Sequence, residues 1–116
     1  MQHDPRAYLW DARESALAIQ SFVADLDINS YSLNLMAQAA TERKFEIIGE
    51  ALNQLSKVDP LIAGKIPELA QIVSFRNQLI HGYSKIKPST VWSVVSSSLP
   101  SLLQKVNELL EELGHN

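Results

Sequence analysis

The sequence predicts an all-α protein, a compact bundle of four to five helices, on two observations. Apolar residues recur at intervals of three and four along most of the chain, which is the period of a helix that buries one face. No segment alternates apolar and polar residues as a half-buried strand does. With 116 residues and 46% hydrophobic side chains, we expect a single domain over residues 1–116 with its own core.

The first predicted helix begins after Asp4 and ends near Asp27. Asp4 can accept hydrogen bonds from free backbone amides, and Pro5 tolerates the first helical position. The face that this helix should bury is one apolar seam, formed by Leu9, Ala12, Ala16, Ile19, Val23 and Leu26.

A second helix is predicted from about residues 30–32 to about Lys57, because Asp59 and Pro60 end it. Gly49 lies in the middle of this helix, where it costs about 1 kcal/mol of helix propensity relative to alanine. We therefore expect a neighbouring helix to approach closely at Gly49. The predicted inner face consists of Phe45, Ile48, Leu52 and Leu55.

A third helix is predicted to open at Pro67 and to end near Gly82. It follows a short connection, residues 61–66, which has room for one helical turn of its own. The apolar residues of the third helix are Leu69, Ile72, Val73, Leu79 and Ile80.

A fourth helix is predicted from Pro88 to Gly114. Glycine commonly follows helix ends, so Gly114 is the expected terminator. Pro100 should kink or split it after Leu99, with neighbouring serine hydroxyls available to the carbonyls that lose their amide partners. Its apolar seam is formed by Val91, Val95, Leu99, Leu102, Val106, Leu109 and Leu113.

Composition and charge narrow the classes of function. The net charge of −3 argues against a globally basic nucleic-acid-binding surface, but residues 61–90 alone carry a net charge of +3. Cysteine is absent, which excludes disulfides and thiolate metal sites. The start of the chain lacks the features of a signal peptide, and no stretch approaches the roughly 18 apolar residues of a membrane span. We therefore expect a cytoplasmic protein without membrane association.

The positive segment contains RNQLIHGY, residues 76–83, which places a charged residue in an apolar seam. A guanidinium keeps its charge, and burying it unpaired costs several kcal/mol, so Arg76 must meet a carboxylate or face a water-filled cleft. Glu50, next to Gly49, is the expected partner of Arg76, and this ion pair alone is one explanation of the arginine. The seam consists of Leu69, Ile72, Arg76, Leu79 and Tyr83, at spacings of three and four.

His81 follows Arg76 by five positions, so in a regular helix the two side chains point about 140° apart. They can converge if the helix unwinds at Gly82, or if a second copy supplies the other residue across a two-fold axis. Taken singly, His81 reads as a surface or helix-capping residue. Three glutamates of the second helix are spaced by four residues: Glu42, Glu46 and Glu50. No histidine lies near them at the spacing of a metal ligand, so we expect a solvated helix face and no metal site.

Taken together, the charged and titratable residues of this segment predict a site for phosphate. RNA supplies its own nucleophile, the 2′-hydroxyl, so its cleavage needs proton transfer and charge stabilisation but no metal or cofactor. His81 can transfer protons near neutral pH, and Arg76 can hold the phosphate. Asn77 offers supporting hydrogen bonds, while Lys85 and Lys87 can contact the RNA backbone. Because each chain offers one such histidine, a homodimer with a shared cleft would complete the acid and base pair.

The pattern R-x4-H-x-Y, from Arg76 through His81 to Tyr83, resembles that of HEPN-domain proteins, specifically the HepT-like toxins that pair with a minimal nucleotidyltransferase. The resemblance spans nearly the whole chain. One departure is Glu68, which stands where members often have tryptophan. The further matching segments are Tyr8-Leu9, residues 47–51 (IIGEA), Leu55-Ser56, Val91-Trp92 and Leu99-Pro100.

The resemblance implies a homodimeric, metal-independent endoribonuclease toxin of a type VII-like toxin–antitoxin system. Arg76 and His81 would be catalytic in a composite dimer cleft, with Asn77 supporting them. It also implies a nucleotidyltransferase antitoxin that transfers AMP from ATP to Tyr83, so that ATP is the partner's substrate and this chain has no cofactor. Two other interpretations stay open: a non-catalytic HEPN-like module that binds nucleic acid or a nucleotidyltransferase, and a subunit that serves only oligomerisation.

Overall fold

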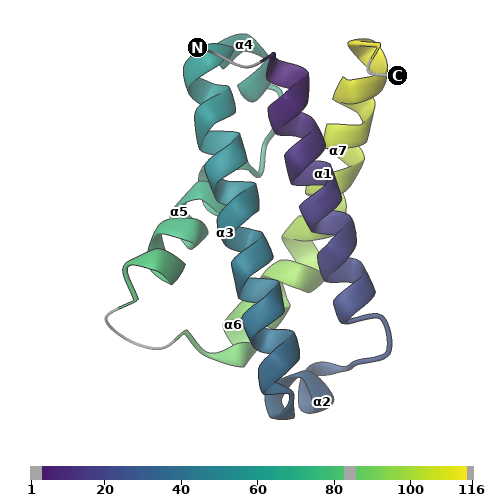
Figure 1. Cartoon of the computed structure of the whole chain (residues 1–116), viewed down its shortest axis with the longest axis vertical. Coiled ribbons are helices and arrows are strands. Elements are labelled where there is room, and N and C mark those ends of the chain that lie inside the picture. Colours follow the sequence, from purple (N-terminus) through teal and green to yellow (C-terminus); the bar gives the residue numbers. More distant parts are fainter. Residues whose placement is uncertain (1–3, 83–85, 115–116) are drawn as a thin grey trace.

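The computed structural model describes residues 4–82 and 86–114 and shows a helical bundle (Figure 1). Within these residues no strand occurs, so the predicted all-α fold class is confirmed. None of the helices described is both long and apolar enough to cross a membrane. In chain order the elements are α1 (Pro5–Phe22), α2 (Ile28–Leu33), α3 (Leu35–Val58), α4 (Pro60–Ala63), α5 (Leu69–Ile80), α6 (Pro88–Ser93), a π-helical turn (Val94–Ser98) and α7 (Leu99–Glu112).

The central helix of the bundle is α3, which packs against α1 on one side and α5 on the other, while α1 also packs against α7 (Figure 1). The predicted inner faces of the first two helices are confirmed. Val23 and Leu26 pack against the core from the connection that follows α1, and they are partly buried. The fully or almost fully buried residues of α1 and α3 include Leu9, Ala12, Ala16, Ile19, Phe45, Ile48, Leu52 and Leu55.

The predicted second helix is divided, and α1 ends at Phe22, earlier than the predicted end near Asp27. Asp27 starts a new helix instead: its carboxylate accepts from the Ser30 N–H at 2.8 Å, while the Ser30 hydroxyl accepts from the Asp27 N–H at 2.9 Å. Asn34 then ends α2 in an extended conformation, and its side chain accepts from the Ala37 N–H at 2.9 Å to begin α3. The two caps therefore convert one expected helix into two.

The connection over residues 61–66 holds the predicted helical turn, which is the C-terminal part of α4. Asp59 begins α4 by accepting a hydrogen bond from the Ile62 N–H at 3.1 Å. The third helix starts two residues later than predicted from Pro67, because the chain first makes a turn in which the Leu69 N–H donates to the carbonyl of Ile66 at 3.2 Å.

The predicted break near Pro100 takes the form of the π-helical turn Val94–Ser98, so it lies before Leu99 and not after it. Proline lacks an N–H donor, and a widened turn ahead of it accommodates the carbonyl that has lost its partner. The Ser98 hydroxyl does not serve the helix carbonyls as expected. It donates to Oε1 of Gln71 at 3.0 Å, which joins this turn to α5.

The start of α1 and the end of α7 lie at the same end of the bundle (Figure 1). Asp4 caps α1 as predicted, since its carboxylate accepts from the Arg6 N–H at 2.9 Å. The Arg6 guanidinium also donates to the carbonyl of Gly114 at 3.3 Å. Gly114 follows α7 with a φ of 65°, a conformation that favours glycine, so its predicted role as terminator is confirmed.

The side chain of Tyr31, on the short helix α2, lies fully inside the core, and its ring packs against that of Trp92 with centroids 5.2 Å apart. Burial, assisted by the negative charge of Glu42 and opposed by the Thr41 hydroxyl, raises the pKa of Tyr31 to about 12. The folded state thus keeps the phenol neutral at a pH where an unfolded chain has already ionised it.

We expect the free energy of unfolding to decrease as the pH rises from about 10 to about 12, by roughly 2–3 kcal/mol. In this window the unfolded state has released the Tyr31 proton and the folded state has not, so unfolding is favoured; below pH 10 both states bind it and the effect vanishes. Urea unfolding at pH 9 and pH 11.5 measures the change. In Tyr31→Phe this part of the alkaline loss should disappear, and an equal loss in that variant would contradict the assignment.

Candidate active site

The helix α5 is anchored on α3 by its two buried residues, Ile72 and Phe75. The ring of Phe75 meets that of Phe45 on α3 edge to face, with centroids 5.2 Å apart and an interplanar angle of 83°. Phe75 was not among the apolar residues predicted for this helix. Conversely, Ile80 was among the apolar residues predicted for this helix, but it is 48% exposed, and the C-terminal end of α5 lies away from α3 (Figure 1). The aromatic contact therefore fixes the position, relative to α3, of the residue that follows Phe75.

That residue is Arg76, and the predicted close approach at Gly49 is confirmed by its position. A methyl group added to Gly49 would lie 2.7 Å from Cγ of Arg76, closer still to its Cβ, and 3.4 Å from the carbonyl oxygen of Ile72. Only glycine leaves room for the stem of the arginine to cross α3 at this level. The glycine therefore determines where the guanidinium emerges.

The guanidinium of Arg76 forms an ion pair through Nη2 with Oε2 of Glu50, the partner predicted from the sequence. Its Nη1 donates to Oδ1 of Asn77 at 2.7 Å, and Oε1 of Glu50 accepts from Nε2 of Gln54 at 3.1 Å. The Arg76 side chain is 13% exposed and that of Glu50 is 54% exposed. The carboxylate thus covers a nearly buried cation at the protein surface. Of the five N–H donors of a guanidinium, two are engaged in these contacts.

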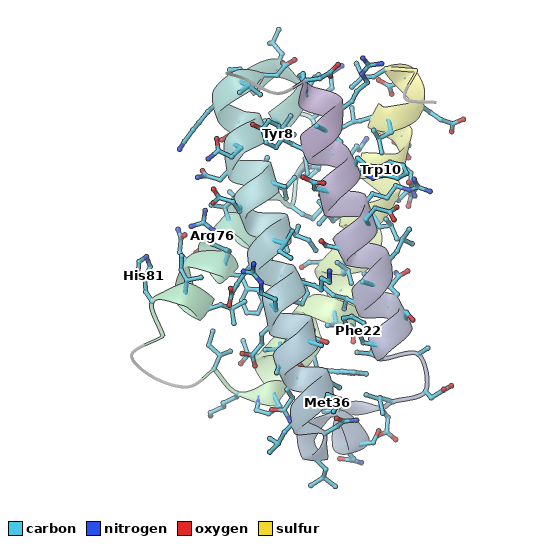
Figure 2. All side chains as sticks on the ribbon, viewed as in Figure 1. Tyr8, Trp10, Phe22, Met36, Arg76 and His81 are labelled. Carbon is cyan, nitrogen blue, oxygen red and sulfur yellow. The ribbon has the colours of Figure 1, made fainter. Side chains whose placement is uncertain are left out.

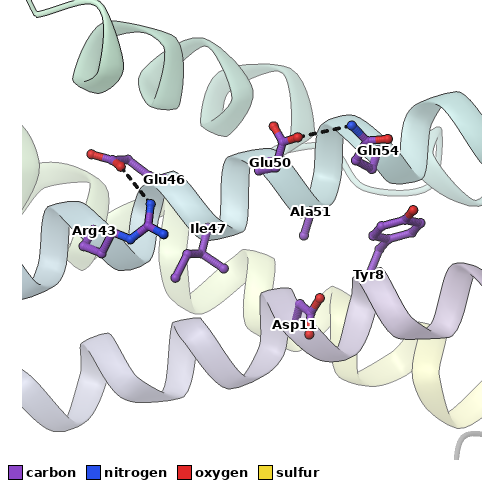
Figure 3. A pocket seen from close by; sticks show the side chains of 8 residues that line it. All are labelled: Tyr8, Asp11, Arg43, Glu46, Ile47, Glu50, Ala51 and Gln54. Atoms are coloured by element: carbon purple, nitrogen blue, oxygen red, sulfur yellow. Dashed lines mark hydrogen bonds and ion pairs between the residues drawn. The ribbon is translucent and has the colours of Figure 1, made fainter. Parts of the chain in front are cut away.

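Sequence reasoning missed Gln54, although its spacing of four residues from Glu50 on a helix is a usable signal. Figure 3 shows this hydrogen bond together with the ion pair of Arg43 and Glu46, one turn earlier on α3, whose Nη1 and Oε1 atoms are 3.1 Å apart. An open pocket of about 220 Å³ lies beside these residues, where Tyr8 and Asp11 of α1 face α3 (Figure 3).

His81 immediately follows α5, and its backbone N–H donates to the carbonyl of Asn77 at 3.0 Å. Its side chain is exposed. Figure 2 shows His81 at the outer end of α5, whereas Arg76 lies on the part of α5 that is next to α3. The helix stays regular up to Ile80, so it does not unwind early enough to bring the imidazole and the guanidinium together within one chain.

The remaining predicted site residues lie beyond α5. Tyr83 and Lys85 are outside the described residues. Lys87 is exposed at the start of α6, where its carbonyl accepts from the Thr90 N–H at 3.0 Å. Among the residues that the structure describes, no group of three or more histidine, aspartate and glutamate side chains is arranged to hold a metal ion.

Comparison with known proteins places this arrangement in a family. The family model described as Ribonuclease HepT-like matches residues 12–109. The chain belongs to this family. A provisionally named RNase of Methanocaldococcus jannaschii is 33% identical over 90% of this chain and 95% of its own length. A second provisionally named RNase of that organism is 27% identical, over 95% of this chain and 90% of its own. No solved structure matches the chain.

A third relative is a provisionally named ribonuclease HepT of Thermococcus cleftensis, 28% identical over 94% of this chain and 98% of its own length. The HepT-like family predicted from the R-x4-H-x-Y pattern is therefore confirmed, and with it the enzyme class, an endoribonuclease. The roles of the individual residues, the dimer and the nucleotidyltransferase partner stay predictions.

Proposed function

We propose that this HepT-like ribonuclease is the toxin of a toxin–antitoxin pair and cuts RNA without a metal, using Arg76 and His81 in a cleft formed by two copies. The observation that carries the proposal is the setting of Arg76. A nearly buried guanidinium is held at a defined place by Gly49, Glu50 and Asn77, and two of its five N–H donors are engaged within the part of the chain that the structure describes. Such a fixed planar donor suits a phosphodiester.

In the proposed reaction the 2′-hydroxyl of the RNA attacks the adjacent phosphorus. Arg76 binds the non-bridging phosphate oxygens and stabilises the charge that grows on them. His81, whose side chain is exposed, transfers a proton. Asn77 keeps the guanidinium oriented through the bond to Oδ1. Lys87, and Lys85 two positions earlier in the sequence, would contact flanking phosphates, so binding should weaken as salt rises.

The homodimer is proposed because one chain separates Arg76 and His81 along α5 (Figure 2). A second copy related by a two-fold axis can bring its own histidine to the first copy's arginine. We expect light scattering after size-exclusion chromatography to give about twice the 12.9 kDa chain mass at the concentrations used for activity. A fully active monomer at those concentrations would contradict the shared cleft.

Regulation is proposed to occur at Tyr83, two residues after His81. A nucleotidyltransferase antitoxin would transfer AMP from ATP to its phenol. Each added nucleotide would bring a phosphate charge and bulk to the motif, so it would compete with the RNA substrate. The proposed site of modification by the partner is thus a single tyrosine, that of the motif.

The test of the proposed function is cleavage of total RNA by the purified protein in EDTA, after mass spectrometry has shown that Tyr83 carries no AMP. We expect cleavage by the wild type and a loss of roughly 10²–10⁴-fold in His81→Ala. His3→Ala, which changes a histidine outside the motif, is the matched control and should cleave normally.

The Arg76–Glu50 ion pair also fits the rival interpretation, a HEPN-like module without turnover, because it satisfies the charge of Arg76. An inert wild type that is free of AMP would favour the module and end the ribonuclease proposal for this chain.

A further inference from the structure

The proposed reaction needs two proton transfers, one from the attacking 2′-hydroxyl and one to the leaving 5′-oxygen. His81 can perform one of them, and the structure places it away from Arg76 along α5 (Figure 2). A different titratable group does touch Arg76 directly. Glu50 places its carboxylate on the guanidinium, and its side chain is 54% exposed.

Both oxygens of this carboxylate are held by contacts with neighbouring side chains. Oε2 is bound by Nη2 of Arg76 and Oε1 by Nε2 of Gln54, at 3.1 Å. A carboxylate has about four lone-pair sites, so two such bonds leave acceptor capacity on its exposed side. General bases are commonly held in this way, because fixed orientation must precede proton transfer.

The geometry of a guanidinium connects this carboxylate to the reacting atoms. Its five N–H donors lie in one plane around a single carbon, so two ligands bound to neighbouring donors lie side by side. A phosphate on the remaining donors of Arg76 would lie beside the Glu50 carboxylate. The 2′-hydroxyl is attached to the ribose next to that phosphate, which brings its proton within reach of Glu50.

We propose that Glu50 is a catalytic residue of this ribonuclease, the general base that removes the proton of the 2′-hydroxyl. This inference rests on the proposed function. The 2′-oxygen forms a bond to phosphorus as its proton passes to Glu50, and the bond from phosphorus to the 5′-oxygen breaks as that oxygen takes a proton from His81. The products are a 2′,3′-cyclic phosphate and a 5′-hydroxyl, and transfer of one proton from Glu50 back to His81 through solvent restores the enzyme.

The charged groups near Glu50 set the conditions for this role. Arg76 approaches from α5, and Asp11 of α1 lines the pocket on the other side of α3 (Figure 3). On α3 itself, Arg43 and Glu46 lie in the preceding turns and pair with each other. Tyr8 is the remaining titratable residue among those that line this pocket. The direct contact of Glu50 is therefore with a cation, while the other acids are a helical turn or a helix away.

The experiment compares Glu50→Gln with Glu46→Gln, the same substitution at a glutamate one turn earlier that pairs with a different arginine. Both are assayed against an AMP-free wild type in EDTA, with a labelled oligonucleotide containing a single ribonucleotide step, at saturating enzyme, from about pH 3 to pH 9. We expect Glu50→Gln to lower the cleavage rate by about 100-fold or more and to lose the acid-side slope of log rate against pH. Glu46→Gln should stay within threefold of the wild type.

Two further measurements separate catalysis from structure. Glutamine can still accept from Arg76 and contact Gln54, so Glu50→Gln should bind a non-cleavable 2′-deoxy analogue within threefold of the wild-type affinity. Glu50→Asp keeps a carboxylate and should retain the acid-side slope at a reduced rate, even if Glu50→Gln folds poorly. A Glu50→Gln rate within threefold of the wild type and with the acid-side slope intact would overturn this inference alone, whereas an inert wild type would overturn the ribonuclease proposal as well.

Discussion

Arg76→Lys is expected to lower the rate of RNA cleavage by about 10²–10³-fold while the bundle remains folded. Lysine keeps the positive charge but replaces five planar donors with a single ammonium, so it cannot bind Glu50, Asn77 and a phosphate at fixed angles. The larger part of the loss should appear in kcat, because oriented donors act mainly on charge that develops in the transition state.

Arg43→Lys is the matched control for this substitution. Arg43 is an exposed arginine of α3 that pairs with Glu46 much as Arg76 pairs with Glu50. Surface ion pairs contribute about 0–1 kcal/mol, so this variant should keep the wild-type rate and stability. Circular dichroism and thermal unfolding establish that both variants are folded. If Arg76→Lys cleaves at the wild-type rate, the arginine serves as a structural charge and the proposed phosphate contact is wrong.

The central contact of the candidate site could be predicted from sequence because two separate anomalies pointed to one place. Gly49 weakens a long helix, and Arg76 puts a charge in an apolar seam, so each needs an explanation that the other supplies. Gln54 was not predicted, although its spacing of four residues from Glu50 places the two side chains on the same face of α3. Tyr83 and Lys85 lie outside the described residues, so their placement stays a prediction.

The errors in the predicted fold have local physical causes. Hydrophobic spacing predicted one helix from about residues 30–32 to about Lys57, but the side-chain caps of Asp27 and Asn34 start two separate helices where spacing alone gives no signal. Phe75 and Ile80 differ from the sequence prediction for another reason. Both satisfy a helical period, but the C-terminal end of α5 diverges from α3 (Figure 1), and Phe75 is buried whereas Ile80 is half-exposed.

Gly49→Ala is expected to destabilise the protein by about 1–3 kcal/mol and to reduce cleavage at least tenfold. The added methyl group would lie 2.7 Å from Cγ of Arg76 and nearer to Cβ, an approach that real side chains do not tolerate. Since Phe75 and Ile72 fix α5 on α3, relief requires either a wider spacing of the helices or a new path for the arginine side chain. Both outcomes move the guanidinium away from Glu50.

The direction of this effect is diagnostic, because helix propensity alone predicts the opposite. Alanine favours a helix interior over glycine by about 1 kcal/mol, so without a packing constraint Gly49→Ala would stabilise α3. Ala39→Gly, at an exposed position of the same helix, measures that propensity term in this protein and should destabilise it by about 1 kcal/mol. Urea unfolding of the two variants, with cleavage rates measured in parallel, then isolates the contact with Arg76. A Gly49→Ala protein that is more stable than the wild type and fully active would show that the close approach of α3 and α5 does not position the arginine.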